Sequence, residues 1–163
     1  MLYFYIFLNT ELQVMKVLLN IVVVIFSVAS MEALSWVIHK YLFHGPLWFI
    51  HKTHHFPHKD YFEFNDIFSL GFGLLAMGLM WHGHQNLGYT FWIGTGISVY
   101  GVIYFVFHDC FIHGRVKPFK SQNLYLWAIK RAHKIHHKSI QKNPATFFGL
   151  LWVNTKKLNL PKV

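Results

Sequence analysis

The longest uncharged stretch of the chain, residues 67–108, runs for 42 residues without a lysine, arginine, aspartate or glutamate. A helix needs about 20 apolar residues to cross a hydrocarbon core of roughly 30 Å, so this stretch is long enough for two spans. Its middle, Trp81-His82-Gly83-His84-Gln85-Asn86-Leu87-Gly88, has the residue types of a turn. The stretch therefore predicts a helical hairpin with arms at residues 67–81 and 89–107. A buried bundle in a soluble protein is disfavoured, because a 163-residue domain has little interior for so long an uncharged run.

A second apolar run lies at residues 17–38, where Glu32 is the single charge among 22 residues. As a helix it would span roughly 33 Å. A cleaved signal peptide is disfavoured because the apolar run continues past Ala29. Residues 1–8 are too short to span, and we expect them at the membrane interface. Charged residues make up 13% of the chain, against about 25% in soluble domains. We therefore expect one all-α integral membrane domain over residues 1–163, with three transmembrane helices.

The basic residues predict the topology. Fourteen of the 15 lysines and arginines lie in two segments, three between residues 40 and 59 and eleven after Cys110, while the turn at residues 82–88 has none. The positive-inside rule places both segments in the cytoplasm, beside the ends of the first and third spans. This basic surface suits anionic lipid headgroups or an acidic partner protein better than nucleic acid, because it adjoins membrane spans.

Ten of the 13 histidines form a duplicated pattern at the two basic segments. Each half contains His-x4-His followed by His-x2-His-His. The ten residues are His39, His44, His51, His54, His55, His108, His113, His133, His136 and His137. Neutral imidazole is the commonest metal ligand, whereas ten clustered imidazolium ions would repel one another. The pattern predicts a helical cap with two metal ions, each bound by several imidazole nitrogens. His58, His82 and His84 fall outside it.

Helix geometry distinguishes the two elements of the pattern. Steps of three and four residues return to one helix face, so the three histidines of each His-x2-His-His element can converge. A step of five rotates about 140° on a regular helix, so His39 and His44 cannot both face one metal from it. Either the helix is perturbed there or the two residues serve different metals. Imidazole suits zinc, copper, iron and nickel, so the ligand type alone does not choose the ion.

Few carboxylates accompany the histidines. Glu32 lies seven residues before His39 on the same helical face, and an acid inside a membrane span is a functional candidate, so we expect it to orient a ligand histidine. Asp109, next to His108, is a candidate for the same role. Glu63, Asn65 and Asp66 open the hairpin near the site; for Asp66 the alternative is a helix N-terminal acid that interacts with the helix dipole.

The combined motifs resemble those of the bacterial β-carotene hydroxylases, within the fatty-acid hydroxylase and sterol desaturase superfamily. The resemblance runs from about Met31 to Val153. It includes the histidine pairs and triplets, Met31-Glu32, Phe62-Glu63-Phe64-Asn65-Asp66, Tyr104-Phe105 and Phe148-Gly149. It implies that the ten histidines bind two iron ions, with zinc a second candidate in the purified protein. It also implies O₂-dependent hydroxylation of the β-ionone ring at carbon 3, from β-carotene through cryptoxanthin to zeaxanthin, and with keto-carotenoids toward astaxanthin. The expected location is the bacterial inner membrane, where the carotenoid enters from the bilayer.

The reaction needs electrons from outside the chain. No Gly-x-Gly-x-x-Gly fingerprint is present, and the single cysteine excludes a cysteine-ligated iron–sulfur cluster. The resemblance implies ferredoxin and ferredoxin reductase, or a similar donor, which the basic face could steer. Two alternatives differ in function: a hydroxylase or desaturase of a sterol or fatty acyl chain, and a histidine-rich metal transporter. The transporter predicts ligands near the bilayer midplane, whereas these histidines gather at the ends of the spans. A structural zinc protein would need closed four-coordinate sites.

Overall fold

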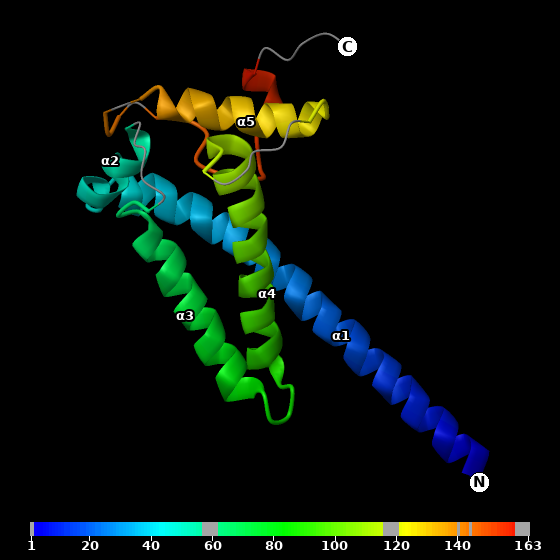
Figure 1. Ribbon diagram of the computed structural model, residues 1–163. Coiled ribbons are helices and arrows are strands. Elements are labelled where there is room, and N and C mark those ends of the chain that lie inside the picture. The colour runs from blue at the N-terminus through cyan, green and yellow to red at the C-terminus, as the bar shows by residue number, and fades with distance from the viewer. Residues whose placement is uncertain (1, 57–61, 116–120, 140, 144, 159–163) are drawn as a thin grey trace.

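The computed structural model describes residues 2–56, 62–115, 121–139, 141–143 and 145–158 (Figure 1). Within these residues the regular structure is entirely helical, so the all-α prediction is confirmed. The long helices are α1 (Leu2–Val37), α3 (Asp66–Gly83) and α4 (Tyr89–Tyr104), with the shorter α2 (Trp48–His55) and α5 (Leu124–His137). Two π-helical segments, η1 (Ile38–Phe43) and η2 (Phe105–His113), continue α1 and α4, and a short 3-10 turn, η3 (Thr155–Lys157), follows α5 in sequence.

The predicted hairpin is present as α3 and α4, and α4 packs against both α3 and α1. Glycine permits both close approaches. At Gly94 a Cβ would lie 2.7 Å from the carbonyl oxygen of Ala76 in α3, and at Gly96 it would lie 2.4 Å from the Cβ of Ser27 in α1. From Leu2 onward, residues 1–8 form the first turns of α1, and their location at the membrane interface stays a prediction. The helix extends through them because residues 1–36 contain no proline or glycine that would end it.

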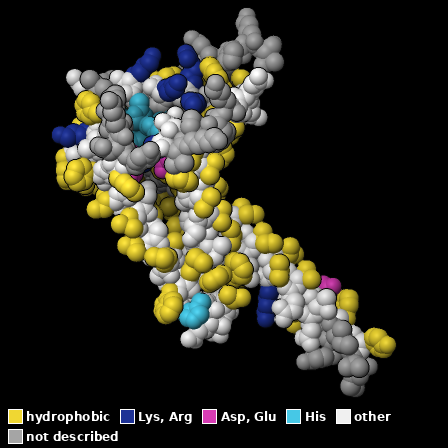
Figure 2. All heavy atoms as spheres, viewed as in Figure 1, with side chains coloured by type: hydrophobic (Ala, Val, Ile, Leu, Met, Phe, Trp, Pro, Cys, Tyr) yellow, Lys and Arg dark blue, Asp and Glu magenta, His cyan; other side chains and the backbone are white. Residues whose placement is uncertain are grey.

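Two helices are long and apolar enough to cross a membrane, Phe7–Phe43 and Tyr89–His113. In the most apolar 18-residue stretch of each helix, only 11% and 22% of the residues are buried within the protein. Their side chains therefore mostly face outward, unlike those of a soluble core helix. Figure 2 shows hydrophobic side chains over the visible surface of this part of the molecule. The 18-residue α3 would span roughly 27 Å and is not among the two helices, so a third span stays a prediction.

A helical cap closes one end of the bundle. In Figure 1, α5 crosses over the end of η2, at the opposite end of the hairpin from its turn. Phe111 and Ile112 of η2, Ile129 of α5 and Leu150 form a buried apolar cluster between them. Asn123 begins α5, with its side-chain oxygen accepting hydrogen bonds from the backbone of Tyr125 and Leu126. The cap therefore sits where α1 and α4 end, which brings the two histidine-bearing segments together.

Candidate metal centre

The two π-helical segments bring together the histidines that a regular helix would separate. In η1 the amide of His44 donates to the carbonyl of His39, a step of five residues, over 3.0 Å. An i→i+5 hydrogen bond is that of a π-helix, whose wider turn brings residues five apart nearer to one side, and the two ring centroids lie 5.3 Å apart. The η2 segment does the same for His108 and His113, whose ring centroids are 4.6 Å apart. Of the two alternatives open for the His-x4-His pairs, the perturbed helix is the one observed. Gly114 then ends η2 in the left-handed conformation, with φ 68°.

Nine of the ten histidines form two groups, within each of which the nearest ring nitrogens all lie within 4.8 Å of one another. We call the first group cluster A and the second cluster B. Cluster A contains His39, His44, His51, His55 and His136; cluster B contains His54, His108, His113 and His133.

The His-x2-His-His elements do not converge as units, which differs from the prediction. In α2, His51 and His55 join cluster A, while His54 points to cluster B. In α5, His136 joins cluster A and His133 joins cluster B. The reason is that α2 and α5 each lie between the two clusters, so each helix presents ligands on two adjacent faces.

The tenth histidine, His137, lies beside both clusters. Its ring stacks on His55 at 4.6 Å and contacts His113 at 4.8 Å. Its Nε2 is buried and has no hydrogen-bond partner among the described residues. Such an orphaned nitrogen is costly in a protein interior, and a metal ion would satisfy it.

Each ring of cluster A is held by a hydrogen bond at the nitrogen that faces away from the cluster. His39, His44, His55 and His136 donate from Nδ1 to the backbone carbonyls of Phe148, Lys142, Ser139 and Thr146, over 2.8 to 3.0 Å. His51 donates to Asn65 Oδ1 over 2.8 Å. These bonds place the proton on Nδ1 and leave Nε2 as a lone pair directed into the cluster.

Cluster B uses carboxylates for the same purpose. His54 Nδ1 donates to Glu63 Oε1 over 2.9 Å, and His108 Nδ1 donates to Asp109 Oδ1 over 2.7 Å. Arg115 contacts both acids, at 3.4 and 3.6 Å, and forms two bonds to Asp66, of 2.8 and 2.6 Å. The hydrogen bonds to Asp66 raise the pKa of Arg115 above its usual range, so the guanidinium stays charged and balances the acids.

The inward nitrogens come too close for neutral rings alone. The Nε2 atoms of His39 and His51 lie 3.0 Å apart, those of His44 and His136 3.2 Å, and those of His54 and His108 3.1 Å. With protons on both Nδ1 atoms, two lone pairs face each other in every one of these pairs. Nitrogens that share one ion at about 2.1 Å lie roughly 3 to 3.5 Å apart, so a cation fits both clusters.

Protonation cannot relieve these contacts near neutral pH. Burial lowers the pKa of His51 to about 3, that of His136 to about 3 and that of His55 to about 4. Burial, together with neighbouring His113, lowers the pKa of His137 to about 2. The rings are therefore neutral, which is the form that binds metal.

Of the polar residues predicted to orient the histidines, some bind a cluster histidine and others do not. Asn65 and Asp109 accept hydrogen bonds from cluster histidines, whereas Asp66 is the first residue of α3 and binds Arg115. The prediction for Glu32 is corrected: its carboxylate accepts from Tyr100, Leu151 and Trp152 rather than from a histidine. The cause is that the chain after α5 returns to α1 and brings backbone amide donors beside Glu32.

Some supporting groups carry no signal in the sequence. The four backbone carbonyls of cluster A belong to ordinary residues, and only the fold reveals them. Arg115 could have been noticed as a base two residues after His113, the last residue of the second His-x4-His pair. His82 and His84 are exposed near the hairpin turn, far from the clusters, and His58 lies outside the described residues.

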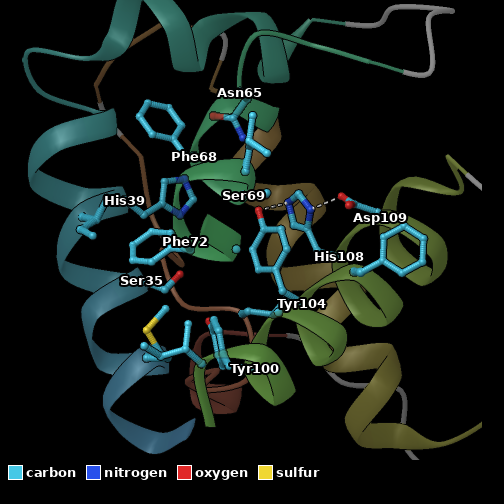
Figure 3. Close-up of a pocket in the computed structure, with 18 of the residues that line it drawn as sticks. Ser35, His39, Asn65, Phe68, Ser69, Phe72, Tyr100, Tyr104, His108 and Asp109 are labelled. Atoms are coloured by element: carbon cyan, nitrogen blue, oxygen red, sulfur yellow. Dashed lines mark hydrogen bonds and ion pairs between the residues drawn. The ribbon is translucent and has the colours of Figure 1, made fainter. Parts of the chain in front are cut away.

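A cavity of about 660 Å³ leads from the clusters into the bundle. Side chains of α1, α3 and α4 line it, and His39, His51, His54 and His108 form its inner end. In Figure 3 the Tyr104 hydroxyl points toward His108, 3.3 Å from its Nε2. Most of the wall is apolar, and the lining residues Leu70, Met77 and Val102 are themselves 61–62% exposed. The wall is therefore continuous with the outer apolar surface.

Comparison with known proteins identifies relatives over most of the chain. It is 36% identical over 137 residues to a β-carotene hydroxylase of Pseudescherichia vulneris, covering 83% of this chain and 77% of that protein. It is 35% identical over 136 residues to a β-carotene hydroxylase of a Paracoccus species, covering 82% and 83%. A chloroplastic β-carotene 3-hydroxylase of Arabidopsis thaliana is 36% identical over 104 residues, 61% of this chain and 34% of the plant protein. No protein-family profile and no solved structure matches the chain.

Proposed function

The chain belongs to the bacterial β-carotene hydroxylases, and from that premise we propose that it hydroxylates the β-ionone ring of carotenoids at carbon 3. The products would be cryptoxanthin and then zeaxanthin from β-carotene, with keto-carotenoids as further substrates toward astaxanthin. One observation carries the proposal: two histidine clusters form the end of an apolar cavity whose wall is continuous with the outer surface. A carotenoid dissolved in the bilayer could place its ring at the clusters without entering water.

The proposed cofactor is a pair of iron ions, one in each cluster, with zinc able to occupy the same nitrogens in purified protein. When bound, iron would supply the activation of O₂, the co-substrate from which the new hydroxyl group derives. Burial keeps the imidazoles neutral, and the chain's own hydrogen-bond acceptors hold them turned toward the ions. Glu63, Asn65 and Asp109 do so with side-chain oxygens, and the segment after α5 does so with carbonyls.

The substrate cavity favours a long apolar molecule with a compact ring at its end. Phe68 and Phe72 line the cavity near the histidines, and Ser35 and Tyr100 are among the few polar groups along it (Figure 3). A ring would pack against the aromatic side chains, while a keto group could approach a hydroxyl. Sterols and fatty acyl chains also fit an apolar cavity by chemistry, and the family relationship is what favours a carotenoid.

Electrons would arrive at the face of α5 that is turned away from the clusters. Arg131, Lys134 and Lys138 follow each other at steps of three and four residues and are exposed, while His133 and His136 are buried on the opposite side. Figure 2 shows lysine and arginine side chains gathered around the histidine end of the molecule. We propose that an acidic donor such as ferredoxin, reduced by its reductase, docks there. Anionic lipid headgroups would contact the same basic end.

The proposed topology has three spans in the bacterial inner membrane, formed by α1, α3 and α4 of a single domain. The basic histidine end would face the cytoplasm and the hairpin turn the other side. The short α3 would then need a thinner bilayer or a contribution from its flanking residues.

The test is expression in cells that accumulate β-carotene, with pigment analysis and ¹⁸O₂ labelling. We expect zeaxanthin that carries ¹⁸O in its hydroxyl groups. A His54→Ala variant should abolish the product, whereas His84→Ala, at the far end of the bundle, should retain it. If the parent chain is well expressed and yields no hydroxylated carotenoid, the proposal is refuted.

A further inference from the structure

The chain after α5 turns back over cluster A. We call residues 139, 141–143 and 145–152 the return segment. Its carbonyls at Ser139, Lys142, Thr146 and Phe148 accept hydrogen bonds from four of the five histidines of cluster A. In cluster B, His54 and His108 donate instead to the carboxylates of Glu63 and Asp109, outside this segment. Cluster A and these two histidines of cluster B are thus supported by different parts of the chain.

The return segment is bent sharply where it meets cluster A. Phe147 has φ 61°, a left-handed conformation that is uncommon for a residue with a large side chain. The carbonyls on either side of it, of Thr146 and Phe148, bind His136 and His39. Such a conformation persists only where the surrounding contacts determine it, so something must hold the segment at both sides of this bend.

Glu32 provides the hold on the far side. Its Oε1 accepts from the amide of Leu151 over 2.8 Å and from that of Trp152 over 3.0 Å. Its Oε2 accepts from the Tyr100 hydroxyl over 2.9 Å, so the carboxylate joins α1, α4 and the return segment. At Gly149 a Cβ would lie 3.1 Å from the same Oε1, which shows how closely the backbone passes the acid.

From these contacts we propose that Glu32 is a positioning residue for one ion of the pair, the ion of cluster A. It anchors the return segment, whose carbonyls orient four imidazoles of that cluster, whereas Glu63 and Asp109 orient His54 and His108 of cluster B. The inference rests on the proposed function in one respect, that two ions bind. Acids and Arg115 support cluster B independently of Glu32.

The experiment measures zinc binding to the full-length protein in detergent, with free zinc set by chelator buffers. The parent chain should bind two ions. Glu32→Ala should weaken one of the two by about 10- to 100-fold, the usual effect of losing a group that orients a metal ligand, and leave the other unchanged. Glu63→Gln, the matched control, should weaken the other ion instead.

Combined variants identify which ion is lost. Glu32→Ala added to His44→Ala should have little further effect, because both act on cluster A. Glu32→Ala added to His113→Ala should weaken both ions. Gly149→Val crowds the carboxylate without removing it and should reproduce the effect of Glu32→Ala, and far-UV circular dichroism checks that each variant keeps its helices.

Unchanged binding of both ions in Glu32→Ala would overturn the proposal. So would equal weakening of both ions, or loss of folded protein in both Glu32→Ala and Gly149→Val, since Glu32 would then support the whole fold. Failure of the parent chain to bind a second ion would instead refute the two-metal site. Because zinc binding needs no carotenoid, the result is independent of hydroxylase activity.

Discussion

Metal binding by this protein should release almost no protons, even in mildly acidic solution. A histidine with an ordinary pKa of about 6.5 is roughly three-quarters protonated at pH 6, so four such residues would release about 3 protons on binding metal. Here burial lowers the pKa of His51, His55, His136 and His137 to values of about 2 to 4. At pH 6 these four rings together should carry less than about 0.1 proton.

Isothermal titration calorimetry of zinc into the apoprotein at pH 6, in buffers of different ionisation enthalpy, measures this release directly. The four histidines should contribute no detectable proton, and zinc affinity should be nearly flat between pH 8 and pH 6. Release of 3 or more protons per protein would show that these rings are exposed and charged without metal. The reasoning from burial would then be wrong.

The same depressed pKa values predict that acid destabilises the apoprotein. Because these rings take up protons more readily when unfolded, the free energy of unfolding is highest above about pH 6.5 and falls as the pH falls toward 4 and then 3. Thermal melts over this range should show a falling midpoint. Gly96→Val should destabilise the protein by about 1 to 3 kcal/mol, since a Cβ there lies 2.4 Å from that of Ser27, whereas Gly71→Val meets open space; thermal melts in detergent compare the two. Gly73→Leu should fill the cavity and lower carotenoid conversion at least about 10-fold with zinc binding unchanged, whereas Gly78→Leu, outside the cavity lining, should keep both. Leu87→Asn should stabilise the protein by about 0.5 to 1 kcal/mol and so raise the melting midpoint, because Leu87 has φ 45° and asparagine tolerates that conformation better; an unchanged midpoint would argue against strain in the turn.

The sequence predicts the parts of this molecule that depend on composition and local spacing. Uncharged runs and the turn at residues 82–88 were enough to predict the hairpin, because a long apolar helix has few other environments open to it. The ten histidines could be selected because two matched sets of that size have no ordinary structural explanation. Both inferences depend on residue types, which a sequence displays directly.

The rest depends on backbone conformation and on contacts distant in sequence. A π-helical turn at His39 and His108 has no residue signature, so the step of five could only be posed as two alternatives. Two of the three partners of Glu32 are backbone amides about 120 residues away, which any residue type except proline could supply. Spacing placed Glu32 on the face of His39, yet its carboxylate accepts hydrogen bonds from the amides of Leu151 and Trp152.

The duplicated motif does not produce two independent sites, and this helps to place the tenth histidine. Each half of the pattern builds one cluster and gives the other cluster a single ring: His54 from the first half and His136 from the second. These two residues occupy the same position in their His-x2-His-His elements. By the same correspondence His137 matches His55, which belongs to the cluster of its own half.

His137 should therefore be the fifth ligand of cluster B. Its ring lies 4.5 Å from His133, 4.7 Å from His54 and 4.8 Å from His113, all members of that cluster. Its buried Nε2 lacks a hydrogen-bond partner among the described residues, and a metal ion would satisfy it. The exchange of one ring between the halves also means that neither cluster can be completed before both halves have met, so the two metal sites should assemble together with the packing of α2 and α5.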